Sequence, residues 1–175
     1  ISDLHTPYTN YNFLERAVLP NQDADVLLIK GDNISYEIYS HFGNKKNINL
    51  IDEHKKLYNI LDKLSKIFPW IIIFDGNHER RARRNIKKKV VRGINGVIDN
   101  RIPLDDVTRF FDNVDYVPHY LVQIGDLVAA HPDHFSKIPA RTVVNELDNL
   151  LGNEHQKEFD EFSVVSIGHT HKLNK

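Results

Sequence analysis

Five short segments of the sequence concentrate carboxylate, carboxamide and imidazole side chains that can bind metal ions. They are Asp3-Leu4-His5, Gly31-Asp32-Asn33, Gly76-Asn77-His78-Glu79, His131 and Gly168-His169-Thr170-His171. Mixed nitrogen and oxygen donors without a thiolate suit borderline divalent cations, and a pair of such cations is a common device for hydrolysing phosphate esters. The residue types therefore predict a dinuclear metal centre.

Apolar runs that are typical of β-strands precede most of these donor segments. The runs cover residues 26–29, 70–74, 127–130 and 164–167, and each ends within two residues of a donor segment. In an open α/β sheet, ligands bind beyond the carboxyl ends of the strands. We therefore expect donors that lie far apart in sequence to converge at one edge of a sheet.

The rest of the sequence alternates strands with helical stretches, which favours an α/β fold with parallel crossovers in its first half. The clearest helix covers 50–68, because apolar residues recur there every three or four positions until Pro69. A second helix should follow Asn77. Further helices are expected over 11–19 (ended by Pro20), 34–42, 105–111 and 139–151. The remaining strands are expected over 25–29 and in a hairpin that pairs 116–124 with 127–130 across Gly125-Asp126.

The composition is that of an ordinary globular chain. Its 175 residues are 41% hydrophobic and 27% charged, with a formal net charge of -1, which suits a single domain over 1–175. There is no cysteine, so disulfides and thiol catalysis are excluded. No apolar stretch could cross a bilayer and no signal-peptide pattern opens the chain, so we expect no membrane partner and a cytoplasmic (intracellular) location. Ile1 stands where a strand should end, so we also expect trimming at both ends.

The order of the motifs resembles the calcineurin-like metallophosphoesterase superfamily. Asp-x-His, Gly-Asp, Gly-Asn-His-Glu, a lone His after a strand and Gly-His-x-His follow one another in that order from Asp3 to His171. The general pattern also looks, more loosely, like compact bacterial and phage members. The resemblance implies an α/β fold of the metallophosphoesterase type, an αββα sandwich of two mixed sheets flanked by helices.

The resemblance also implies a role for each donor. Asp32 would bridge two divalent metal ions, of which Mn²⁺ is the most expected, with Zn²⁺, Fe²⁺ and Ni²⁺ as alternatives. His78 resembles the family's proton donor or transition-state stabiliser at the leaving oxygen. The first metal would be held by Asp3, His5 and His171, and the second by Asn77, His131 and His169.

A basic run leaves from one of the donor segments. Between Arg80 and Arg92 there are eight Lys or Arg residues and no acid. Because the run begins beside Asn77, its first turn should raise the local potential for a polyanion. We take Arg80, Arg81 and Arg84 as candidate substrate contacts, and His134, three residues after His131, as another. The alternative explanation of the charges is a solvated helix face.

At two places the sequence departs from particular subfamilies, and each departure disfavours one of them. Purple acid phosphatases have a metal-binding Tyr where this chain has Ser35, so a ferric centre of that type is disfavoured. Serine/threonine phosphatases of the calcineurin type have an Asp-Arg-Gly sequence after the bridging Asp, which this chain lacks. We therefore expect a metal-dependent phosphoesterase that acts on a phosphodiester of a nucleotide or nucleic acid. The alternatives are a phosphomonoesterase, a nuclease subunit of the double-strand-break-repair type, and a non-catalytic scaffold of the same fold.

Overall fold

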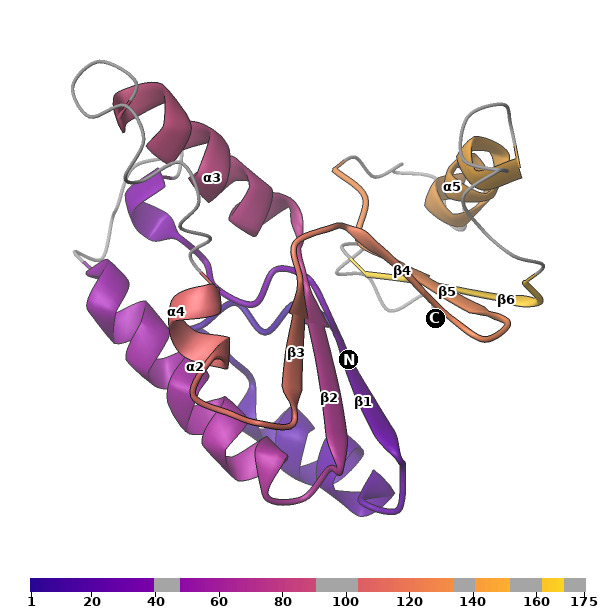
Figure 1. Ribbon diagram of the computed structural model, residues 1–175, viewed down its shortest axis with the longest axis horizontal. Coiled ribbons are helices and arrows are strands. Elements are labelled where there is room, and N and C mark those ends of the chain that lie inside the picture. Colours follow the sequence, from indigo (N-terminus) through magenta and orange to yellow (C-terminus); the bar gives the residue numbers. More distant parts are fainter. Residues whose placement is uncertain (40–47, 91–103, 134–140, 152–161, 169–175) are drawn as a thin grey trace.

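The computed structural model describes residues 1–39, 48–90, 104–133, 141–151 and 162–168, with only the backbone of 87–90 and 149–151. Over these residues the fold is mixed α/β and contains two three-stranded sheets, which Figure 1 shows next to each other. The α/β class that the sequence predicted is therefore confirmed.

The first sheet contains β1 (Val26–Lys30), β2 (Trp70–Phe74) and β3 (Val114–Val117) in that order. Both pairings are parallel, and Ile73 of β2 lies opposite both Ile29 and Tyr116. All of β2 except Trp70 is buried. A continuous apolar run is expected for a central parallel strand, because it is covered on both faces.

The first six residues extend this sheet beyond β1. Parallel bridges pair Ser2 with Lys30 and Thr6 with Ile34. The backbone N–H of Lys30 donates to Ile1 O at 2.8 Å, and that of Thr6 donates to Asn33 O at 2.9 Å. The donor segment at the start of the chain is thereby held alongside the segment that follows β1.

Helix α2 (Leu50–Ser65) supplies much of the core. Asn49 caps its first turn, because its side-chain oxygen accepts the backbone N–H of Asp52 at 2.8 Å. Leu57, Leu61 and Leu64 are buried in one hydrophobic cluster with the strands of the first sheet. In Figure 1, α2 and the short α4 (Asp105–Thr108) lie on the same side of this sheet.

The second sheet contains β4 (Leu121–Ile124), β5 (Leu127–Ala130) and β6 (Val164–Ile167). Strands β4 and β5 form the predicted antiparallel hairpin, and β5 pairs with β6 in parallel. Gly125 has a φ of 57°, which suits the tight turn. The second sheet is therefore mixed, as expected. In the first sheet, the pairings between the described strands are all parallel. Helix α5 (Arg141–Leu151) lies beside β6 (Figure 1).

One predicted strand was wrong in its extent. We expected 116–124 to pair with 127–130 as one strand, but Tyr116 and Val117 belong to β3 and pair with β2. Pro118 follows directly, and a proline has no backbone N–H with which to continue a ladder. The chain therefore leaves the first sheet there and enters the second at Leu121.

Several helix boundaries also differ from the prediction. The stretch 11–19 is not one regular α-helix, because α1 (Tyr11–Phe13) continues as the π-helix η1 (Leu14–Val18) and the 3-10 turn η2 (Leu19–Asn21). Over 34–42 the described residues contain only the 3-10 turn η3 (Glu37–Tyr39), and α4 ends at Thr108 instead of 111. Helix α3 (Asn77–Val90) is present where a helix was predicted to follow Asn77, and it begins at Asn77 itself. Within the described residues, no helix is long and apolar enough to cross a membrane.

Three contacts fasten the second sheet to the end of β1. The ammonium of Lys30 donates to Ser166 Oγ at 2.5 Å. Nδ1 of His131, the residue after β5, lies 2.8 Å from Lys30 O. A side chain at Gly168 would lie 3.0 Å from Lys30 O and 2.7 Å from Nδ1 of His131. The carboxyl ends of strands from both sheets therefore meet.

A buried carboxyl group in α2 makes stability depend on pH. Glu53 has no exposed surface, and its Oε1 accepts the backbone N–H of Glu37 at 3.1 Å. Burial raises the pKa of Glu53 from 4.5 to about 7. A pKa raised on folding gives stability that is complete below the unfolded value and is lost as pH rises through the folded value.

We therefore expect the free energy of unfolding to fall between about pH 4.5 and 7 more steeply in the wild type than in Glu53→Gln. The difference between the two proteins should change by roughly 1–3 kcal/mol over that range. Urea denaturation at a series of pH values measures it. Parallel pH profiles for the two proteins would contradict the shifted pKa.

Candidate metal centre

One carboxylate oxygen lies at the centre of the converging donor segments. Oδ2 of Asp32 is 3.7 Å from Nε2 of His5, 3.8 Å from Nε2 of His78 and 3.3 Å from Nε2 of His131. Asp32 and His131 are buried, whereas His5 and His78 are partly exposed. Residues from three distant parts of the chain therefore direct imidazole nitrogens at a single oxygen.

The donors form two groups that share Asp32. His5, Asp32 and His78 can place one ligand atom each within 4.8 Å of one another, and so can Asp3, Asp32 and His131. The amide oxygen of Asn77 joins the second group, because it lies 3.2 Å from Nε2 of His131. A carboxylate common to two groups has the placement that a bridging ligand requires. The grouping differs from the division implied by the resemblance, in which Asp3 accompanied His5.

Hydrogen bonds orient two of the three histidines toward this oxygen. Nδ1 of His131 lies 2.8 Å from Lys30 O, and Nδ1 of His78 lies 2.7 Å from Ser35 O. Because a carbonyl can only accept, Nδ1 of each ring carries the hydrogen and Nε2 of the neutral ring has the lone pair. At His78 this requires that Arg81 Nη2, which lies 3.1 Å from Nδ1, donates to Ser35 O. Metal-bound histidines are commonly oriented in this way by a backbone carbonyl. In a protonated ring Nε2–H donates to the carboxylate, whereas in a neutral ring the Nε2 lone pair faces it and a cation between the two would relieve their repulsion.

Electrostatic coupling keeps Asp32 charged. Burial alone would raise the pKa of Asp32, but the contacts with His131 and His78 outweigh it and hold the pKa well below its usual range. For His131, burial lowers the pKa, and the hydrogen bond and charge of Asp32 reverse this and raise it. Asp32 is therefore ionised at neutral pH and offers a negative charge to a bound cation.

Glu79 accepts backbone hydrogen bonds from two donor segments. Its Oε2 accepts the N–H of Asp32 at 3.0 Å and of Gly76 at 2.8 Å. Its Oε1 accepts the N–H of Asn33 at 2.8 Å and of Ile34 at 3.1 Å. Burial and the neighbouring charge of Asp32 raise the pKa of Glu79 to about 7, and backbone hydrogen bonds, those of Ile34 and Gly76 among them, oppose that shift by stabilising the carboxylate. One side chain thus fixes two donor segments relative to each other.

The bond to Gly76 is half of a capping box. Glu79 is the third residue of α3, and it reaches back to the backbone N–H of Gly76 just before the helix. Gly76 has no side chain to complete the box. Oδ1 of Asp32 takes that place, because it accepts the backbone N–H of His78 at 2.9 Å. This bond directs the other oxygen of Asp32 toward the histidines.

Glycines allow the donor segments to approach closely. A side chain at Gly76 would place its first carbon 2.1 Å from both N and Oδ1 of Asp32. At Gly31, which has a φ of 64°, it would lie 2.6 Å from the backbone of Gly76 and 2.7 Å from the ring of His131. Both positions therefore exclude every residue with a Cβ atom unless the site rearranges.

Three donors have left-handed backbone conformations, which are uncommon outside glycine. The φ angles are 60° at Asp3, 45° at His5 and 50° at Asp32. Such residues cost on the order of 1–3 kcal/mol each and persist where the surroundings hold them, often at functional sites. Here the backbone N–H of Asp3 donates to Gly31 O at 3.1 Å, and that of His5 donates to Asp32 O at 2.8 Å.

Two arginines in the first half of α3 bind other parts of the protein, which the sequence did not predict. Arg80 donates to Asp133 Oδ1 from Nε at 3.0 Å and from Nη2 at 2.6 Å, and its Nη2 also donates to His131 O at 3.0 Å. Arg83 forms an ion pair with the buried Asp75. Arg80 and Arg83 therefore hold α3 against neighbouring segments. The alternative explanation of a solvated helix face does not apply to these two residues.

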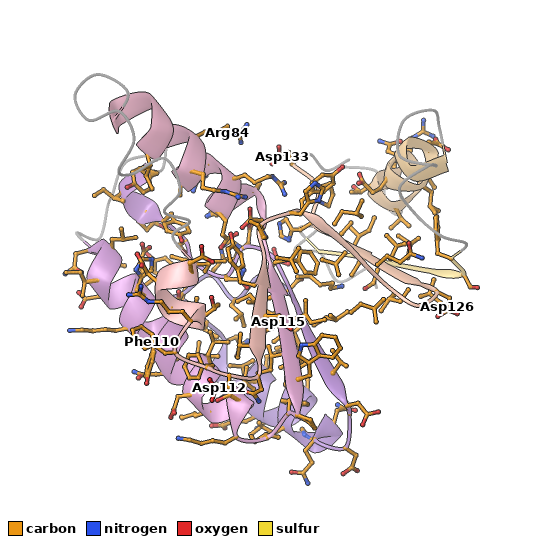
Figure 2. All side chains as sticks on the ribbon, viewed as in Figure 1. Arg84, Phe110, Asp112, Asp115, Asp126 and Asp133 are labelled. Atoms are coloured by element: carbon orange, nitrogen blue, oxygen red, sulfur yellow. The ribbon has the colours of Figure 1, made fainter. Side chains whose placement is uncertain are left out.

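The other two arginines differ from this pair. Arg81 donates from Nη2 to Ser35 O at 3.2 Å, the carbonyl that also orients His78, so it lies beside the centre. Arg84 is exposed, and Figure 2 shows it on α3, on the same side of the molecule as Asp133. As substrate contacts, Arg80, Arg81 and Arg84 stay a prediction.

The structure thus brings most of the predicted site residues together. Those it places in one cluster are Asp3, His5, Asp32, Asn77, His78 and His131. His134, His169 and His171 lie outside the described residues, and Gly168, directly before His169, packs against the ring of His131. Sequence reasoning gave no role to Glu79, although an acidic residue three positions after Gly76 is the signal of a capping box. It also missed Asp75, whose Oδ1 accepts the hydroxyl of Tyr116 at 2.5 Å.

Comparison of the chain with protein-family models, with curated proteins and with solved structures gives no match. The candidate function therefore depends on the residues themselves and on the geometry of the cluster.

The role of Glu79 can be tested by Glu79→Gln at about pH 8, where the wild-type carboxyl group is ionised. A glutamine has one acceptor oxygen, so its amide group would face two buried N–H donors that Glu79 satisfies. Leaving them without acceptors should lower the free energy of unfolding by roughly 2–4 kcal/mol in urea denaturation. The control is Asp62→Asn, which removes an exposed ion pair with Lys66 and should cost less than about 0.5 kcal/mol. A cost for Glu79→Gln as small as the control would contradict its role.

Proposed function

We propose that the protein is a metal-dependent phosphoesterase that hydrolyses a phosphodiester of a nucleotide or nucleic acid. The observation that supports it most is the convergence of three imidazole nitrogens on Oδ2 of Asp32, within two groups of donors that share this residue. We further propose the fold relationship that the order of the motifs suggests, an αββα sandwich of the calcineurin-like metallophosphoesterase superfamily.

The donor set fits a pair of borderline divalent cations. Carboxylate, carboxamide and imidazole donors suit Mn²⁺, Fe²⁺, Ni²⁺ and Zn²⁺, and no thiolate is available to favour softer ions. A bound pair of cations would polarise a phosphate oxygen and lower the pKa of water at the site. In this proposal Asp32 bridges the pair, and the remaining ligands are Asp3, His5, Asn77, His131, His169 and His171.

His78 is proposed to act on the leaving oxygen. Its Nδ1 is engaged by the Ser35 carbonyl, so Nε2 is the atom that can exchange a proton at the centre. Arg81 donates to the same carbonyl and lies beside the ring, where its positive charge can also attract a phosphate group. The same Nε2 belongs to the donor group with His5 and Asp32. A direct experiment must therefore distinguish a proton-transferring His78 from a ligand.

The first test is metal stoichiometry. After loading with Mn²⁺ and removal of unbound metal, elemental analysis should find up to two ions per chain, and Mn²⁺ should be the best activator of diester hydrolysis. Zinc or nickel found in the purified protein agrees with the same donor set. Fewer than about half an ion per chain after loading would reject the dinuclear centre.

The second test separates the bridging ligand from the proton donor. Asp32→Asn should abolish activity and reduce the bound metal, while asparagine still tolerates the left-handed backbone at this position. His78→Ala should retain the metal and lower turnover by roughly 10²–10⁴-fold, as for the loss of a general acid. The control is Asp115→Asn, since Asp115 is exposed and bonds only Trp70 in the described structure. Loss of one metal equivalent in His78→Ala would identify His78 as a ligand instead.

A further inference from the structure

The segment that connects the two sheets is hydrogen-bonded to the chain at or directly before two of the donor segments. The backbone O of His119 accepts the N–H of Asp75 at 3.0 Å, at the end of β2. The backbone O of Tyr120 accepts the N–H of His131 at 2.8 Å, at the end of β5. Both residues are therefore anchored to segments that carry donors or lead into them.

The side chains of these two residues form a layered stack with an arginine. The rings of His119 and Tyr120 have centroids 5.1 Å apart and are inclined by 24°. The guanidinium carbon of Arg80 lies 5.0 Å from the centroid of Tyr120. His119 is exposed, whereas Tyr120 is partly buried. We call His119, Tyr120 and Arg80 the 119–120 stack.

The stack is fixed in place and adjoins a metal donor. Arg80 donates to the backbone O of His131, and Arg83 donates from Nη1 to the backbone O of Pro118 at 3.3 Å. Pro118 is thus held by α3, and Tyr120 is held by the residue that follows β5. An exposed aromatic surface that is rigid costs little conformational entropy when a flat ligand stacks on it.

The charges around the stack suit a ligand that carries phosphate. The carboxylate of Asp133 pairs with Arg80, so the charge of this arginine is neutralised and its guanidinium packs on Tyr120. Arg84 is exposed one turn further along α3, and Figure 2 shows it on the side of the molecule that carries Asp133. Alternating aromatic surface and positive charge is the arrangement by which proteins bind unpaired nucleobases and their phosphates. In the sequence the basic run has no interleaved aromatic residue, and it is the fold that brings the rings of 119–120 to it.

We propose that His119 is a stacking platform for an unpaired nucleobase next to the scissile phosphodiester, so that the substrate class is single-stranded nucleic acid or its short fragments. The assignment of a scissile phosphodiester rests on the proposed function, whereas base stacking on His119 does not. Stacking is tolerant of base identity, because every base has a π-face. The platform therefore gives preference for a base-bearing diester without sequence readout.

The first experiment compares two chromogenic diesters with the same leaving group. Thymidine 5′-(p-nitrophenyl phosphate) carries a base, and methyl p-nitrophenyl phosphate has neither a base nor another ring in its place. His119→Ala should raise KM for the thymidine ester about tenfold and leave kinetics on the other diester within about twofold. His119→Phe retains an aromatic face and should behave as the wild type on both. The control for a lost exposed ring is Phe110→Ala, because Phe110 packs against Tyr58 away from the 119–120 stack.

The second experiment measures binding without catalysis. Fluorescence anisotropy of a labelled oligothymidylate in excess EDTA should give a Kd about tenfold higher for His119→Ala than for the wild type, His119→Phe or Phe110→Ala. Equal affinity of all four proteins, or no binding by the wild type, would overturn the platform. Failure of the metal-loaded wild type to hydrolyse either diester would instead reject the proposed phosphoesterase function, because the binding result does not depend on it.

Discussion

The candidate centre depends on a reciprocal set of hydrogen bonds between Glu79 and Asp32. Glu79, in the first turn of α3, accepts the backbone N–H of Asp32, and Asp32 accepts the backbone N–H of His78 in the same turn. Each acid therefore satisfies donors on the segment that carries the other. Two loops that follow different strands are joined by buried, charge-assisted bonds, which are stronger than neutral ones and specific in direction. The position of Oδ2 of Asp32, which lies near the Nε2 atoms of all three histidines, follows from this arrangement.

Much of this centre could be predicted from the sequence because its causes are local or topological. Apolar runs such as β2 identify parallel strands, and donors placed after such runs must meet where the strand ends meet. Helix α2 was predictable because its apolar residues recur every three or four positions and Pro69 follows it. The same reasoning brought Asp32, Asn77 and His131 together without any knowledge of how the loops fold. It could not supply the grouping of Asp3 with His131, which depends on the left-handed turns at Asp3 and Asp32.

The features that sequence reasoning missed are set by tertiary partners. A run of arginines on a helix suggests a charged face, but Arg80 and Arg83 have carboxylate partners 53 and eight residues away, and the pattern of the run does not reveal either. Tyr116 and Leu121 lie in one apolar stretch, yet they belong to different sheets, because Pro118 interrupts the ladder between them. The first helical stretch combines three kinds of helix, and buried Leu14 and Val18 show that packing, not helix propensity, determines its course.

The two donor groups also differ in the order in which folding can assemble them. His5, Asp32 and His78 come from the first 78 residues and from loops of one sheet, so this group can form as soon as β1 and β2 have paired. The group of Asp3, Asp32 and His131 needs the hairpin of β4 and β5 to dock beside β1, a contact between residues about a hundred positions apart. Contacts at such separation carry a larger loop-closure entropy and tend to form late. A nascent chain can therefore possess one half of the centre before the other exists, and the second half is complete only when both sheets have come together.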